Sequence, residues 1–354
     1  MDLDAVADGV LYGSLFHNAL GKMIKVVIDK AIPFLEERLS GKVELTAVSS
    51  SEITKELVGD ADALIVRTRT RCDASLLEGS GVRFVASATA GDDHIDREWC
   101  ETAGIEVCVA SGCNAPGVAQ YTLASLLRSR FDPTTDTLGI VGKGNVGSIV
   151  ASWARQLGIS VVVSDPLRAQ TGFADEDYLS LEEVLQRSRA VTFHVPLTSE
   201  GNYPTLRMLD SGNVGLLRPD AVVINAARGG VIDEKAVLSR LRQSGQLVVD
   251  TWENEPEISL GTLPEAFVAT PHIAGYSLEG KQRGTSMVIE GLNRRFGLDI
   301  DTKGLAGRFD DKGDITASKI LYSYDPFEDT KLLKANPEGF ENLRNHYNYR
   351  REPS

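Results

Sequence analysis

The sequence predicts an α/β protein with two doubly wound parallel sheets, followed by a small C-terminal module. Short apolar segments alternate with helical patterns along most of the chain, as expected for strands that are buried on both faces. The alternation occurs in two successive series, which meet near residue 112. After residue 300 the composition changes to a mixture of polar, acidic and aromatic residues, which marks a separate segment.

The first series begins after residues 1–22, an N-terminal extension that is either a disordered leader or a mis-assigned start. Its first strand, MIKVVID, precedes a predicted helix in IPFLEERLSG that Gly41 ends. The strands predicted in this series are residues 23–29, 43–48, 61–66, 82–87 and 104–110. Those predicted in the second series are residues 137–142, 160–165, 190–196, 221–227, 247–250 and 266–271.

The C-terminal segment, residues 301–354, carries aromatic and apolar side chains that need to be covered. It is too small to form a core of its own, and no disulfide can staple it because the last cysteine is Cys113. A symmetric partner chain is the commonest covering surface, so we expect a homodimer. The side chains concerned are Phe340, Leu343, Tyr347 and Tyr349.

The composition is that of an ordinary globular protein, with 42% hydrophobic and 25% charged residues. A net charge of −13 argues against binding to nucleic acid or to an anionic membrane, since both require a basic face. The four cysteines show neither a CxxC pair nor the spacing of metal ligands, so we expect no metal. Few thiols and no basic leader together indicate a cytoplasmic protein.

The most specific motif is GKGNVG, residues 142–147, which lies between a predicted strand and a predicted helix. Gly142 permits a tight turn, Gly144 lets the backbone approach a pyrophosphate, and Gly147 allows the helix and strand to pack closely. The intervening Asn145 and Val146 begin the helix, whose N–H groups attract phosphate. This context predicts a dinucleotide-binding, Rossmann-like domain.

Asp165 ends the next strand, 18 residues after the last glycine of the motif. A carboxylate there can accept hydrogen bonds from a ribose diol and repels a 2′-phosphate, which favours NAD over NADP. Arg168 is a complication, since a nearby arginine could accommodate that phosphate. The alternative role for Asp165 is that of a turn residue before Pro166.

Three further residues follow strands of the second series, at the edge where open α/β sheets bind ligands. His272 could accept the proton of a hydroxyl group, Glu255 could orient the imidazole, and Arg228 could bind a carboxylate with its planar guanidinium. Each residue alone is more often structural. Together with the nucleotide motif they predict oxidation of a 2-hydroxy acid.

Three arginines alternate in VRTRTR, directly after an apolar strand. If the strand continued, Arg67, Arg69 and Arg71 would share one face. They could then be the solvated charges of an edge strand, or they could bind a small anion.

The motifs GKGNVG, INAARGG, DTWENEP and PHIAGYS resemble the D-2-hydroxyacid dehydrogenase family. The segments SATAGDDHID, SGCNA and PEGFENLRNHYNYRRE narrow this resemblance to members that act on a phosphorylated hydroxy acid. It implies two Rossmann-like domains with a cleft between them, and a C-terminal α+β dimerisation module. The implied domains are residues 23–111 with 274–300 for the substrate, 112–273 for NAD, and 301–354 for dimerisation.

The resemblance also implies roles for single residues. Arg228, Glu255 and His272 match the catalytic positions, and Asp165, Asp250 and Gly275 match positions that contact NAD. Val195 also falls at a cofactor position, where a threonine is expected, and Gln120 replaces an expected glutamate. The implied substrate contacts are Arg67, Thr68, Arg69, Thr89 and Tyr276.

Two alternatives remain open at this point. The chain could act on another hydroxy acid, such as phosphoglycerate, or it could be a non-catalytic protein that senses NAD.

Overall fold

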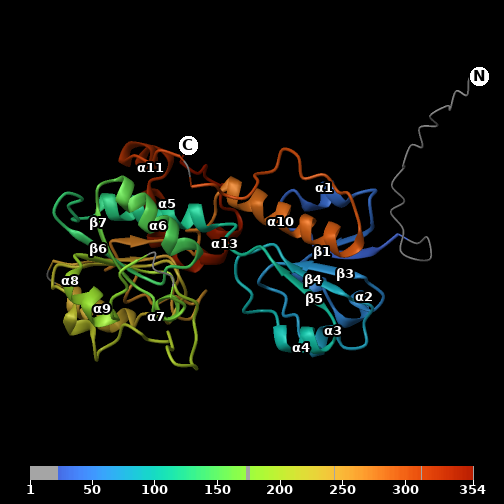
Figure 1. The fold of residues 1–354 in the computed structure, drawn as a ribbon, viewed down its shortest axis with the longest axis horizontal. Coiled ribbons are helices and arrows are strands. Elements are labelled where there is room, and N and C mark those ends of the chain that lie inside the picture. The colour runs from blue at the N-terminus through green and yellow to red at the C-terminus, as the bar shows by residue number, and fades with distance from the viewer. Residues whose placement is uncertain (1–22, 173–175, 243, 312, 354) are drawn as a thin grey trace, which may run out of the picture. The chain divides into compact units, whose positions relative to one another are not determined.

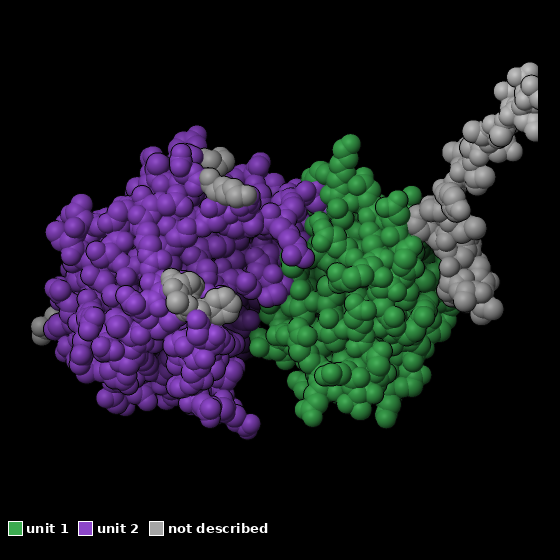
Figure 2. All heavy atoms as spheres, viewed as in Figure 1, with its two compact units in different colours: residues 1–110, 285–304 green, residues 111–284, 305–354 purple. Residues whose placement is uncertain are grey.

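The computed structural model describes residues 23–172, 176–242, 244–311 and 313–353, so the predicted extension 1–22 lies outside the described residues. The chain divides into two compact units (Figures 1 and 2). The first comprises Met1–Ala110 and Thr285–Gly304, and the second comprises Ser111–Gly284 and Leu305–Ser354. Residues 274–284, which were expected in the substrate domain, thus belong to the second unit.

The first unit contains a five-stranded parallel sheet in the order β2-β1-β3-β4-β5. Each strand falls inside a predicted one. Helix α1 and residues 285–296 of α10 lie on one face of the sheet, and α3 and α4 lie on the other (Figure 1). The bounds are β1 Lys25–Asp29, α1 Leu35–Leu39, β2 Glu44–Val48, α2 Lys55–Val58, β3 Ala63–Val66, α3 Ala74–Leu77, β4 Phe84–Ser87, α4 Arg97–Thr102, β5 Glu106–Val109 and α10 Leu278–Phe296.

The second unit contains a six-stranded parallel sheet in the order β11-β10-β9-β8-β6-β7. Each strand overlaps a predicted segment, although β10 begins one residue before its segment and β11 covers only two residues of its own. Helices α5 and α6 cover one face, and α8 and α9 cover the other (Figure 1). The bounds are α5 Ala115–Arg128, β6 Thr137–Val141, α6 Asn145–Gln156, β7 Ser160–Ser164, α7 Pro166–Gln170, α8 Leu181–Arg187, β8 Ala190–Phe193, β9 Val222–Asn225, α9 Glu234–Leu241, β10 Gln246–Val249 and β11 Val268–Ala269.

The C-terminal segment packs onto this second unit. It forms α11 (Ala317–Ser323), α12 (Pro326–Ala335) and α13 (Phe340–Asn345). Within its described residues the only strand-like pairing is the isolated bridge between Ser277 and Arg350, so the predicted α+β character is wrong and the segment is helical.

Side chains of the C-terminal segment enter both hydrophobic cores of the second unit. Ile320 and Tyr324 join the core on the α5–α6 side of the sheet, and Leu333 and Phe340 join the core on the α8–α9 side. The expectation that Phe340 needs a partner chain to be covered is therefore wrong, because it is buried against its own chain.

The four cysteines are free thiols, and Cys72, Cys100 and Cys113 are buried. Burial raises the pKa of Cys72 to about 12 and that of Cys113 to about 11. In the part of the chain that the structure describes, no helix has the length and apolarity needed to cross a membrane. The same residues contain no cluster of three or more acidic, histidine or cysteine side chains suited to a metal ion.

Candidate active site

The three predicted catalytic residues lie in loops at one edge of the second sheet. Arg228 follows β9, Glu255 follows β10 and His272 follows β11. These strands are parallel neighbours, so their carboxyl ends meet at the same edge. The topology thus explains why residues far apart in the sequence come together.

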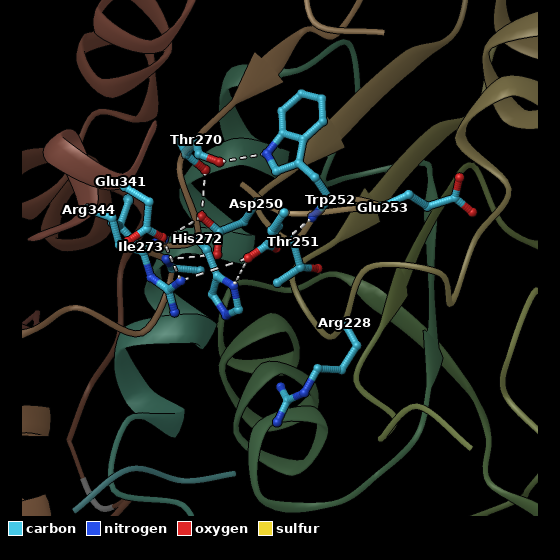
Figure 3. Close-up of polar contacts among 12 residues, drawn as sticks. Arg228, Asp250, Thr251, Trp252, Glu253, Thr270, His272, Ile273, Glu341 and Arg344 are labelled. Atoms are coloured by element: carbon cyan, nitrogen blue, oxygen red, sulfur yellow. Dashed lines mark hydrogen bonds and ion pairs between the residues drawn. The ribbon is translucent and has the colours of Figure 1, made fainter. Parts of the chain in front are cut away.

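His272 and Glu255 form a direct pair (Figure 3). His272 Nδ1 lies 2.7 Å from Glu255 Oε2, and Glu255 Oε1 accepts the backbone N–H of Trp252 at 2.8 Å. An ionised carboxylate can only accept hydrogen bonds, so the imidazole carries a proton on Nδ1. Its Nε2 is then left to exchange a proton with a substrate.

The surroundings keep Glu255 ionised. Burial opposes its charge, but the hydrogen bond and the charge of His272, together with the Trp252 N–H, hold the pKa of this carboxyl below its ordinary value. Glu255 can therefore orient the imidazole throughout the neutral pH range.

The loop that carries His272 is fixed by the buried carboxylate of Asp250. Asp250 Oδ1 accepts the Thr270 hydroxyl at 2.7 Å and the Ile273 N–H at 2.8 Å, while Oδ2 accepts the Ala274 N–H at 2.9 Å (Figure 3). These bonds hold His272 at a φ of 56°, a conformation that non-glycine residues rarely adopt. The predicted contact of Asp250 with NAD remains a prediction.

The buried side chain of Asn225 fixes the loop that carries Arg228. The Asn225 side-chain amide donates to the Arg228 carbonyl at 3.0 Å and to the Thr251 carbonyl at 3.3 Å, which ties the loops after β9 and β10 together. The Arg228 side chain and the His272 ring both point toward the lower part of the view in Figure 3.

A second buried carboxyl group, Glu234, supports the Glu255 loop. It lies in the first turn of α9 and accepts the backbone N–H of Glu253 at 2.9 Å. Burial, reinforced by the charges of Glu253 and Glu255, raises the pKa of Glu234 to about 7.

This raised pKa makes the stability pH-dependent. Because the pKa of Glu234 in the folded state lies above its unfolded value, the contribution of this carboxyl group to the free energy of unfolding is fully present below pH 4.5. That contribution is lost as the pH rises through about 7. Glu234→Gln keeps the acceptor without the charge. We expect it to raise the free energy of unfolding by about 3 kcal/mol at pH 8, and by little at pH 4.5, in urea titrations. Glu182→Gln, at an exposed glutamate of α8, should show no such pH dependence.

The glycine motif lies at the start of α6, where the sequence predicts a cradle for phosphate groups. Gly142 has a φ of 89°, and a Cβ there would lie 2.6 Å from the His194 carbonyl oxygen. A Cβ on Gly147 would overlap the Gly142 carbonyl, whereas one on Gly144 would meet nothing within 4 Å. The two outer glycines are thus required by packing, and the middle one leaves the helix N-terminus open. This arrangement fits a dinucleotide pyrophosphate.

Other predicted cofactor residues lie beside the glycine motif or in the loop that follows His272. A Val195 methyl group would lie 2.7 Å from a Cβ on Gly142, so this side chain lines the glycine turn. Val146 packs against the α5–α6 core, and the Asn145 amide donates to the Ser111 hydroxyl at 3.0 Å. Gly275 approaches Asn114 so closely that a Cβ would overlap its amide group.

Asp165 serves the local fold at the end of β7. Its Oδ1 accepts the Arg168 N–H at 3.0 Å and so caps α7, and its Oδ2 accepts the N–H of Lys143 in the glycine motif at 2.8 Å. The turn-residue role is therefore present, and it places the carboxylate against the nucleotide motif. Sequence reasoning missed the buried side chain of Lys143, whose Nζ lies 2.9 Å from Glu176 Oε2.

The arginines of the first unit do not share a strand face, because β3 ends at Val66. Arg67 binds the buried carboxylate of Asp29, with Nε 2.8 Å from Oδ2. Arg69 is exposed in the following turn. Arg71 is paired with Asp73 at 2.6 Å, and its side chain is 73% exposed, as expected for a solvated charge. Of the other predicted substrate contacts in this unit, Thr68 is exposed and the Thr89 hydroxyl lies 2.8 Å from that of Ser87.

Sequence reasoning also missed Arg344, which α13 brings to the pair of His272 and Glu255 (Figure 3). Its Nη1 lies 4.0 Å from Glu255 Oε2, and its Nε donates to the Tyr276 hydroxyl at 3.3 Å. Tyr276, the predicted substrate contact of this unit, is thus bound to the C-terminal segment. Arg344 lies within the segment PEGFENLRNHYNYRRE, but nothing in that segment indicated a contact with this loop.

Comparison with known proteins agrees with this geometry. The family described as D-isomer specific 2-hydroxyacid dehydrogenase, NAD binding domain, matches residues 124–274. A Bacteroides fragilis protein named erythronate-4-phosphate dehydrogenase is 42% identical over 339 residues, which covers 93% of this chain and 97% of that protein. An Escherichia coli protein of the same name is 40% identical over 350 residues, covering 93% and 92% of the two chains.

Solved structures with the same fold include the TT0316 protein from Thermus thermophilus. It has a TM-score of 0.66 at 26% identity and covers 78% of this chain and 98% of its own. D-lactate dehydrogenase from Aquifex aeolicus, complexed with NAD and lactic acid, has a TM-score of 0.64 at 22% identity and covers 79% and 97%. At 22% identity, the similarity to this lactate dehydrogenase shows a shared fold only. The sequence relatives, which match nearly end to end, show that the chain belongs to the erythronate-4-phosphate dehydrogenase family, among the D-isomer specific 2-hydroxyacid dehydrogenases.

Proposed function

We propose that the protein oxidises 4-phospho-D-erythronate with NAD to 3-hydroxy-2-oxo-4-phosphobutanoate, in the biosynthesis of pyridoxal 5′-phosphate (vitamin B6). The observation that carries this proposal is the 2.7 Å pair of His272 and Glu255, with Arg228 at the same sheet edge. The sequence supports the same proposal, because over 93% of its length this chain is about 40% identical to proteins named erythronate-4-phosphate dehydrogenase.

In this reaction the bound NAD would supply the acceptor for the hydride that leaves C2 of the substrate. His272 Nε2 takes the proton of the C2 hydroxyl group. Glu255 holds the imidazole and stabilises the positive charge that it gains. Arg228 binds the substrate carboxylate and fixes C2 relative to the base. We assign the phosphate to Arg69, with Thr68 and Thr89 as further contacts.

The test is to follow NADH absorbance after adding candidate hydroxy acids to the protein and NAD. We expect turnover with 4-phospho-D-erythronate and much slower turnover with 3-phosphoglycerate. A preference for phosphoglycerate would assign the chain to the alternative substrate. Tight NAD binding without turnover of any hydroxy acid would instead support an NAD-sensing protein.

We infer a preference for NAD over NADP from Asp165. Asp165→Asn can retain an acceptor for the Arg168 N–H, which keeps α7 capped, although it gives up the bond from the Lys143 N–H; it also removes the charge that repels a 2′-phosphate. We expect the ratio of kcat/KM for NAD to that for NADP to fall about tenfold, which corresponds to about 1.4 kcal/mol. If the unmodified protein used both cofactors equally, the inference would be wrong.

We also infer that the protein is a homodimer. Two apolar side chains of the C-terminal helices remain outside the cores, since Tyr322 is 96% exposed and Leu332 is 54% exposed. We expect light scattering to give the mass of a dimer for the full chain, and Tyr322→Glu with Leu332→Glu to give a folded monomer. A full chain that is monomeric at high concentration would contradict this inference.

We place the enzyme in the cytoplasm. Its four cysteines are all free thiols, which is typical of a reducing compartment. Its net charge of −13 also disfavours association with anionic lipids.

A further inference from the structure

The loop that follows the catalytic histidine, residues 273–276, has no helix or strand, so its backbone groups need partners from elsewhere. Its carbonyl oxygens converge on one guanidinium group, that of Arg350. Arg350 Nη1 donates to the Ile273 oxygen at 3.0 Å and to the Tyr276 oxygen at 3.5 Å, and Nη2 donates to the Ala274 oxygen.

The same guanidinium group binds helix α5. Arg350 Nη2 donates to the Gly117 carbonyl at 2.9 Å, and Nε donates to Gln120 Oε1 at 2.8 Å. The Gln120 amide in turn donates to the Arg351 carbonyl at 2.8 Å and to the Ser323 hydroxyl at 2.9 Å. A glutamate at position 120 would accept but could not donate in this way. Arg350 therefore joins the catalytic loop to a long, buried helix.

The side chain of Arg350 has little freedom to move. It is buried, its guanidinium carbon lies 4.3 Å from the centre of the Tyr324 ring, and it donates to the Tyr347 hydroxyl at 3.4 Å. A cation can be buried at tolerable cost only when its donors are used, and the planar fork of arginine uses several at once.

The residues next to Arg350 hold the start of α10. The Arg350 carbonyl accepts the Leu278 N–H at 2.8 Å, and Glu352 accepts the Ser277 hydroxyl at 2.6 Å and also pairs with Arg283. The catalytic loop is thus anchored at its end as well as along its carbonyl groups.

Two side chains of opposite charge, Asp250 and Arg350, therefore bind the backbone of this loop. The N–H groups of Ile273 and Ala274 bind the Asp250 carboxylate, and the carbonyl groups bind the Arg350 guanidinium. His272 adjoins this loop in its left-handed conformation, so its ring position depends on both contacts.

We propose that Arg350 is a positioning residue of the active site, which fixes His272 against Glu255 by binding the carbonyl groups of the loop after His272. This inference rests on the proposed dehydrogenase activity, and it gives the C-terminal motif NYRRE a role in turnover.

The experiment compares Arg350→Met and Arg350→Lys with Lys334→Met. Lys334 is a suitable control because, like Arg350, it is a cation of the C-terminal segment that donates to backbone carbonyls, in this case those of Pro264 and Ala266. For each variant we would measure kcat, the KM for NAD, the melting temperature, and amide hydrogen exchange of a peptide covering residues 270–280.

For Arg350→Met we expect kcat to fall about 10- to 100-fold, the size of loss that follows from misplacing a catalytic group by about 1 Å. The KM for NAD should change little, and exchange in residues 270–280 should accelerate. Arg350→Lys keeps the charge but cannot reach all the acceptors, so an intermediate loss is expected, and it provides the test if the methionine variant does not fold. Lys334→Met should lower the melting temperature while kcat and the exchange of this peptide stay unchanged.

The proposal is overturned if folded Arg350 variants keep the wild-type kcat and exchange, or if Lys334→Met loses as much activity. The exchange measurement does not depend on turnover. Absence of activity in the unmodified protein would therefore refute the proposed function, whereas unchanged exchange in the Arg350 variants would refute this inference alone.

Discussion

Replacing His272 with alanine is expected to lower kcat by about two to four orders of magnitude, the usual cost of losing a general acid–base. The KM for NAD should change little, because the glycine cradle lies at the start of α6 and is built without His272. Stopped-flow and steady-state measurements of NADH formation would give both values. Normal turnover by this variant would show that the catalytic assignment is wrong.

Glu255→Gln is the companion variant. Glutamine can still accept the Trp252 N–H, so the loop should keep its fold, but it cannot offer His272 a charged partner. We expect a smaller loss of kcat than for His272→Ala. The two losses should not add in the double variant, because both residues act through one imidazole.

Replacing Arg67 with alanine is expected to lower the free energy of unfolding by about 3–5 kcal/mol, because it leaves the carboxylate of Asp29 buried without its cation. Asp29 is fully buried at the end of β1, and Arg67 binds both of its oxygens, at 2.8 and 3.4 Å. Urea titration would measure the loss. Adding Asp29→Asn should recover part of it, since the uncompensated charge is then removed, whereas Arg71→Ala should lie within about 0.5 kcal/mol of the wild type.

The same variants separate the two roles predicted for the arginines. Arg69→Ala is expected to raise the KM for a phosphorylated substrate far more than for its dephosphorylated analogue. If Arg67→Ala left stability unchanged and raised only that KM, Arg67 would serve the phosphate and not the fold.

The strands and the catalytic edge could be predicted because their signals are local. Parallel strands buried on both faces appear as uninterrupted apolar runs, and each observed strand falls inside such a run except β10, which begins one residue earlier at Gln246. Arg228, Glu255 and His272 each follow one of these runs, and neighbouring parallel strands bring their carboxyl ends together. The glycine motif could be predicted in the same way, since Gly142 and Gly147 each meet a backbone constraint at their own positions.

The remaining contacts could not be predicted because their partners are distant in the sequence. The prediction for Arg67 considered only an external anion, whereas its partner in the fold, Asp29, lies 38 residues earlier at the end of another strand. Arg350 and Ala274 are 76 residues apart, and a helical segment that returns to the sheet brings them together. Phe340 was expected to need a second chain for the same reason, since the sequence does not show which surface a helix will cover.

The burial of the thiols has a consequence for the oxidative chemistry of the protein. A thiol reacts with peroxides and alkylating agents as the thiolate, and at pH 7 a pKa of about 12 leaves on the order of 10⁻⁵ of Cys72 in that form. Cys113, with a pKa of about 11, is only slightly more ionised. Dehydrogenases that depend on an activated cysteine lose activity under oxidative stress, whereas this protein has no such requirement at its proposed catalytic residues. Oxidation of Cys72 or Cys113 is therefore not expected to limit turnover in peroxide.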